Sequence, residues 1–163
     1  MTKHPHKLIA PTGSQSAKRV LVVIGDVEMG AGGHVDDFPH SDFLGDLIMR
    51  YNEPPYEDMR VDLVFNGDTF DLLKTSYLDS YPRHINSDVA LGKMSRIVAA
   101  HPRFFEALRH FVRYTKAERQ VHFVVGNHDP ELLFAEIQQF ITSICGMSPQ
   151  IHFPGFVLRL PHV

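Results

Sequence analysis

Three oxygen-bearing side chains follow apolar segments of the chain, each directly after a glycine. They are Asp26, Asp68 and Asn127. Two carboxylates and an amide that meet at one place would repel one another or lack partners unless a cation lies among them. Hard cations such as Mn²⁺ and Mg²⁺ prefer oxygen ligands of this kind. The three residues therefore indicate a divalent-metal site, and the alternative is that each of them simply begins a turn or caps a helix.

Strand-like runs precede these side chains, and helix-like patterns separate the runs. The runs lie within 19–26, 60–68 and 120–129, and the first and third are almost continuously apolar, as in strands buried on both faces. The spacing of apolar residues predicts helices over 41–51, 87–100, 102–112 and 129–146. This order predicts right-handed crossovers and a parallel sheet, and hence an α/β fold. The carboxyl ends of parallel strands share one edge, so the oxygen-bearing side chains should meet there.

Two longer motifs contain the second and third of these side chains. Residues 67–71 read Gly-Asp-Thr-Phe-Asp, which matches Gly-Asp-x-x-Asp, and residues 126–129 read Gly-Asn-His-Asp, which matches Gly-Asn-His-(Asp/Glu). With Asp26 after the first strand, where Asp-x-His is expected, their order resembles the calcineurin-like metallophosphoesterase superfamily. The resemblance covers 19–163 and corresponds to the N-terminal part of that domain. It implies a layered α/β fold with a mostly parallel central sheet and flanking helices.

The resemblance also implies roles for individual residues in a site with two metals. Asp68 would bridge the two cations, Asp26 would bind the first and Asn127 the second. His128 would act as a general acid near the leaving group, and Asp71 would orient it. The two cations would activate a water that attacks the phosphoester. Mn²⁺ is the first expectation for both of them, with Mg²⁺, iron and zinc as alternatives.

Some of these positions also have simpler interpretations. Position 28 is Glu28 where the family has a histidine, and it could bind the first metal if the backbone from Asp26 stays extended, or project into solvent. Asp129 is predicted to cap the helix that begins at Pro130. Asp71 could instead cap the turn that follows it, and His128 could be a histidine in a turn.

The other histidines and the glycine-rich segment carry weaker signals. We expect His122, which alternates with apolar residues in a strand, to be packed or solvent-facing and not a ligand. His101 is expected at a loop or helix edge. Residues 30–37 either line the site or form a flexible connection.

The family's later motifs are absent from this chain. No Gly-His-x-His segment follows, and residues 151–163 predict only two short strands around a Pro-Gly turn. The resemblance therefore implies an incomplete second sheet. We expect residues 1–18 to be a disordered lead and residues 19–163 to be a truncated metallophosphoesterase domain or one that another chain completes.

The composition narrows the class of protein. Lys and Arg number 16 against 19 Asp and Glu, so the net charge is −3, and the pI is near 6.4. This balance argues against non-specific binding to nucleic acid or to an anionic membrane. The apolar runs are too short for a membrane span. The single cysteine, Cys145, excludes an intrachain disulfide and a cysteine-only zinc site. We expect a cytoplasmic protein.

The leading interpretation is a metal-dependent phosphoesterase that hydrolyses a phosphate mono- or diester. One alternative is a non-catalytic fragment or interaction module of the same fold, which lacks the later histidine ligands. Another is a phosphatase in which Asp26 itself becomes phosphorylated. That chemistry needs an acid two residues further on, for which only Glu28 is available, and it leaves the Gly-Asn-His-Asp motif unexplained.

Overall fold

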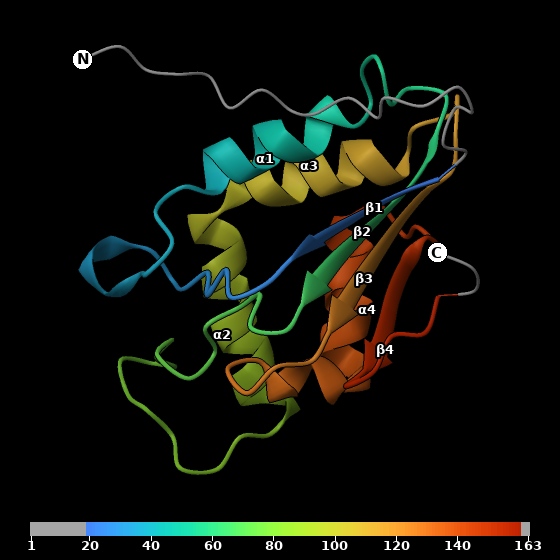
Figure 1. The fold of residues 1–163 in the computed structure, drawn as a ribbon. Helices are drawn as coiled ribbons and strands as arrows, with labels where there is room; N and C mark the ends of the chain where they lie inside the picture. The colour runs from blue at the N-terminus through green and yellow to red at the C-terminus, as the bar shows by residue number, and fades with distance from the viewer. Residues whose placement is uncertain (1–18, 161–163) are drawn as a thin grey trace, which may run out of the picture.

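A parallel four-stranded sheet with four helices against it forms the fold (Figure 1). The chain is described by a computed structural model over residues 19–160, apart from the side chain of Val35. The strands are β1 (Arg19–Ile24), β2 (Arg60–Asn66), β3 (Arg119–Val124) and β4 (Ile151–Gly155). The helices are α1 (Ser41–Arg50), α2 (Ser87–Ala100), α3 (Pro102–Val112) and α4 (Ala135–Ile144), with short 3₁₀ turns at Gly33–Val35 and Pro130–Leu133. The predicted α/β class, with a parallel sheet and flanking helices, is confirmed.

The strands lie in the order β1-β2-β3-β4, so each strand pairs with the next one along the chain. Every pair is parallel, and the register joins Val23 to Val64, Val64 to His122, and His122 to His152. Right-handed crossovers between strands in sequential order put each connecting helix on the same face of the sheet. The hydrophobic core is consistent with helices on one face only. It contains the side chains of one face of the strands, such as Leu63, together with the apolar faces of the helices.

This topology corrects one prediction about the first strand. β1 is not buried on both faces, since Val23 is 56% exposed and Leu21 is 36% exposed. β1 lies at the edge of the sheet and turns those two side chains away from the helices, so its apolar run does not reflect burial on both sides. β3 lies inside the sheet and is buried along most of its length.

An aromatic cluster beneath the carboxyl edge of the sheet anchors one of the two motifs. Phe65 of β2 and Phe123 of β3 stack with their ring centres 5.1 Å apart, and Phe70 packs on Phe104 and Phe105 of α3. Phe70 is completely buried and immediately precedes Asp71. Packing of this aromatic side chain therefore holds the Gly-Asp-Thr-Phe-Asp turn against the core.

Two predicted elements differ from the structure near the C-terminus. The helix expected over 129–146 is interrupted, because Phe134 adopts an extended conformation between the 3₁₀ turn and α4. Of the two strands expected in 151–163, β4 forms, and no regular element follows it as far as residue 160. Residues 161–163, like the predicted lead at 1–18, lie outside the described residues. Within 19–160, no helix has the length and apolarity needed to cross a membrane.

Candidate metal centre

The turns that follow β1 and β2 are joined by backbone hydrogen bonds. The Glu28 amide donates to the Asp68 carbonyl at 2.8 Å, the Met29 amide donates to Thr69, and the Asp71 amide donates back to Met29. Met29 is fully buried and anchors this pairing in the core. The pairing brings Glu28 alongside the Gly-Asp-Thr-Phe-Asp turn, although the two are about 40 residues apart along the chain.

The turn after β3 packs against Asp68. The His128 amide donates to Oδ1 of Asp68 at 2.7 Å. A Cβ added to Gly126 would lie 2.1 Å from that same oxygen and 2.3 Å from the Asp68 nitrogen. Only glycine leaves room for so close an approach, which is the physical reason for the glycine before Asn127.

Three of the four predicted ligands have left-handed backbone conformations. Asp26, Glu28 and Asp68 have φ values of 52°, 52° and 50°. Such a conformation costs about 1–2 kcal/mol for a residue with a Cβ, and it persists where the surroundings enforce it, often at functional sites. Glu28 was expected to lie on the same side as Asp26 if the backbone between them were extended. The backbone is not extended there, so this condition is not met. Pairing with the turn after β2 positions Glu28 instead.

Glu28, Asp71 and His128 form a cluster at this edge of the sheet. One potential ligand atom from each lies within 4.8 Å of the others. His128 Nδ1 lies 3.2 Å from Oδ1 of Asp71, whose side chain is 1% exposed, and His128 Nε2 lies 4.0 Å from Oε1 of Glu28. The predicted pairing of Asp71 with His128 is present. Glu28 turns toward that pair and remains only 28% exposed, so it does not simply project into solvent.

The charges around His128 set its protonation. Desolvation lowers the pKa of the imidazole, but the hydrogen bond to Asp71 and the charges of Glu28, Asp71 and Asp68 oppose it and leave the pKa above its ordinary value. Asp71 also fulfils the simpler interpretation, since its Oδ1 accepts from the Lys74 amide at 3.0 Å and so caps the turn. One carboxylate thus shapes the turn and faces the histidine.

Asp129 differs from its predicted role. It makes no side-chain cap on the turn that follows it. Its carboxylate is completely buried and accepts from the amides of Gly126 at 2.7 Å, Thr69 at 2.8 Å and Phe70 at 3.3 Å. Desolvation raises its pKa, although these three N–H groups act in the opposite direction. Asp129 therefore connects the Gly-Asp-Thr-Phe-Asp turn to the turn after β3, and two of its three partners lie about 60 residues away in the chain.

Asp26 and Asn127 follow β1 and β3 at the same edge of the sheet, and both are exposed. Asp26 lines a hollow of about 340 Å³ that is otherwise mostly apolar, with Phe38, Phe43 and Leu47 among its walls. The assignment of these two residues as ligands stays a prediction.

The sequence did not reveal what holds the glycine-rich segment. Asp36 accepts from the amides of Gly30, Gly32 and Phe38, and its Oδ2 lies 2.8 Å from Nε2 of His101. Desolvation raises the pKa of Asp36, but the three amides and His101 outweigh it and the pKa is lowered. These hydrogen bonds connect the segment internally and join it to His101 at the end of α2. The pair of aspartates at the end of the glycine-rich stretch, Asp36 and Asp37, was the available signal.

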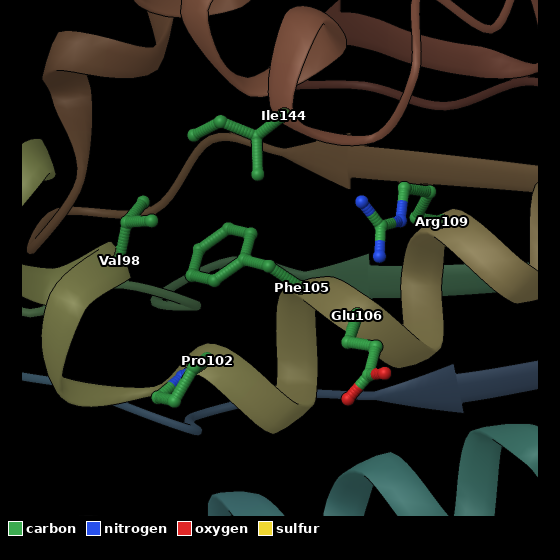
Figure 2. Close-up of a pocket in the computed structure, with 6 residues that line it drawn as sticks. All are labelled: Val98, Pro102, Phe105, Glu106, Arg109 and Ile144. Atoms are coloured by element: carbon green, nitrogen blue, oxygen red, sulfur yellow. The ribbon is translucent and has the colours of Figure 1, made fainter.

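A second hollow lies among the helices, apart from the motifs. Figure 2 shows Val98, Phe105 and Ile144 forming its apolar part, with Glu106 and Arg109 on one side. None of these residues belongs to the three turns, so this hollow contributes nothing to the candidate metal centre.

Comparison of the chain with protein-family models, with curated proteins and with solved structures found no match. The resemblance to metallophosphoesterases therefore depends on the sequence motifs alone.

Proposed function

We propose that the chain is a metal-dependent phosphoesterase that hydrolyses a phosphate mono- or diester with a water activated by two divalent cations. The observation that carries the proposal is the cluster of Glu28, Asp71 and His128 beside Asp68 at the carboxyl edge of a parallel sheet. Three turns far apart in sequence converge there, which is where ligands bind in sheets of this kind.

The donor set fits divalent cations. Asp26, Glu28, Asp68 and Asn127 would hold them through oxygen atoms, and these donors suit Mn²⁺ or Mg²⁺ better than zinc, with iron also possible. The close approach of Gly126 to Asp68 supports the proposal, because it packs the turn that carries Asn127 directly against Asp68. When bound, the two cations would polarise the phosphate and lower the pKa of a water.

Two residues of the protein, Asp71 and His128, would supply the proton that the leaving group needs. Asp71 accepts from Nδ1 of His128 and keeps the proton there, which leaves Nε2, on the side of Glu28, as the nitrogen that would meet the leaving group. The raised pKa of His128 keeps the ring protonated at a higher pH than usual. Nε2 can then donate its proton to the departing oxygen. The competing chemistry, phosphorylation of Asp26, is less well supported, because Glu28 faces the histidine of a neighbouring turn.

We also propose a cytoplasmic location, where a reducing environment suits the buried free thiol of Cys145.

The test compares residues 1–163 with the variant Asp68→Asn and uses Asp46→Asn as the control, since Asp46 is 70% exposed and lies on α1. Calorimetric titration with Mn²⁺ measures binding, and para-nitrophenyl phosphate and its diester measure hydrolysis. We expect Mn²⁺ binding and Mn²⁺-stimulated hydrolysis in the wild type and the control. Asp68→Asn should weaken binding at least about tenfold and abolish hydrolysis. Absence of Mn²⁺ binding in the wild type, or full activity in Asp68→Asn, would overturn the proposal. A trapped phosphoenzyme would favour the Asp26 chemistry instead.

A further inference from the structure

A lysine side chain lies among the carboxylates of the candidate metal centre. Nζ of Lys74 is 3.3 Å from Oδ2 of Asp71 and 3.5 Å from Oε2 of Glu28, and it also forms an ion pair with Asp37. The three carboxylates come from the turn after β2, the turn after β1 and the end of the glycine-rich segment. One ammonium group therefore joins three separate segments.

Two of these three partners belong to the cluster that also contains His128. Glu28 has Lys74 beside one carboxylate oxygen and His128 beside the other. Oδ2 of Asp71 is buried and makes no hydrogen bond among the described residues, so the nearby ammonium compensates its charge. The ammonium therefore contacts Glu28, which is proposed to hold a divalent cation, and Asp71, which faces His128.

An ordinary surface ion pair would not have this arrangement. Exposed pairs contribute little and hold two mobile side chains at a cost in entropy. Here the Asp71 side chain is 1% exposed, whereas that of Lys74 is 47% exposed. Lys74 can therefore leave toward solvent, but Asp71 cannot follow it. The pair is therefore exposed to solvent on the lysine side only.

We propose that Lys74 is a built-in counter-ion of the metal centre, which neutralises Glu28 and Asp71 until a divalent cation displaces its ammonium from Glu28. This inference rests on the proposed function and adds a determinant of metal affinity to it. The ammonium and a divalent cation repel each other within the cluster, so Lys74 weakens metal binding. Removing its charge strengthens binding by about tenfold, a modest value because the side chain is partly exposed.

The experiment is a calorimetric titration of residues 1–163 with Mn²⁺ alone. Lys74→Met keeps the length of the side chain without its charge and should bind Mn²⁺ about tenfold more tightly than the wild type. Lys74→Arg keeps the charge and should bind as the wild type does. Lys116→Met is the matched control, because Lys116 pairs with Glu57 on another surface and its loss should leave binding unchanged.

The outcomes separate the two proposals. Unchanged or weaker Mn²⁺ binding in Lys74→Met, with a wild type that binds, overturns the counter-ion role and leaves the phosphoesterase proposal intact. A wild type that binds no Mn²⁺ overturns both. Thermal unfolding without metal provides a second readout. If Lys74 only held the turns together, Lys74→Met would lose stability and bind Mn²⁺ no more tightly.

Discussion

The close contact between Gly126 and Asp68 predicts a large effect from the addition of one methyl group at position 126. In Gly126→Ala, the new Cβ would lie 2.1 Å from Oδ1, 2.3 Å from the nitrogen and 2.7 Å from Cγ of Asp68. Rotation of the Asp68 side chain cannot relieve the contact between the new Cβ and the backbone nitrogen of Asp68. That backbone is also tied to Glu28 through a hydrogen bond to its carbonyl. The substitution must therefore displace the turn that carries Asp68.

The size of the effect follows from that displacement. Ordinary contact begins near 3.4 Å, so Asp68 must move by about 1 Å. Overpacking of this kind costs about 1–3 kcal/mol, which corresponds to a fall in Tm of roughly 2–12 °C for a domain near this size. A misplacement of about 1 Å at a reacting centre lowers the rate by about a hundredfold. Gly126→Ala should lose hydrolysis to a greater extent than its stability loss alone explains.

Gly25→Ala is the matched control for this measurement. Gly25 occupies the same place after β1, and a Cβ there would meet only the Asn66 carbonyl at an ordinary 3.4 Å. Thermal unfolding, Mn²⁺ titration and para-nitrophenyl phosphate hydrolysis are compared for both variants. Equal Tm, Mn²⁺ affinity and rate in Gly126→Ala and Gly25→Ala would refute the close-packing argument.

Two further predictions concern pH. Because the folded-state pKa of His128 lies above its unfolded value, its protonated form persists to higher pH and hydrolysis falls as the pH rises through the folded pKa. Asp71→Asn should therefore move this fall in kcat/KM to lower pH, and an unmoved profile would contradict the pairing. Asp62 is completely buried in β2, where desolvation raises its pKa but hydrogen bonds from Arg19, Arg60 and His122 lower it from 3.8 to about 2. Its ionised form stabilises the fold above the unfolded pKa and loses that effect as the pH falls toward 2, so urea denaturation of Asp62→Asn should show a loss of about 2 kcal/mol near neutrality that shrinks in acid. A loss that is independent of pH would show that the charge is not responsible.

Much of the architecture could be predicted because its signals are local. The apolar runs that end at Asp26, Asp68 and Asn127 identified three strands and the edge where they finish. The alternation of these runs with helical patterns predicted a parallel sheet. The pairing of Asp71 with His128 was also predicted, but through the resemblance of the motifs rather than through any local pattern.

The exposed face of β1 was missed for a topological reason. An apolar run is compatible with burial on one face or on both, and the choice depends on strand order. The sequential order places the helices on one face and leaves Val23 on the other. No pattern within residues 19–24 distinguishes these cases.

The local signals therefore establish where strands and helices form and which residue types end the strands, because backbone preferences and the periodicity of apolar side chains act over a few neighbouring residues. The partners of polar side chains depend on segments brought together by folding. Asp129 follows a strand like any helix cap, yet its carboxylate accepts from amides about 60 residues earlier in the chain. Lys74 lies in a turn, yet its ammonium contacts Glu28, 46 residues away. A buried carboxylate takes the strongest donors within reach, and those are set by distances in space that the order of residues does not contain.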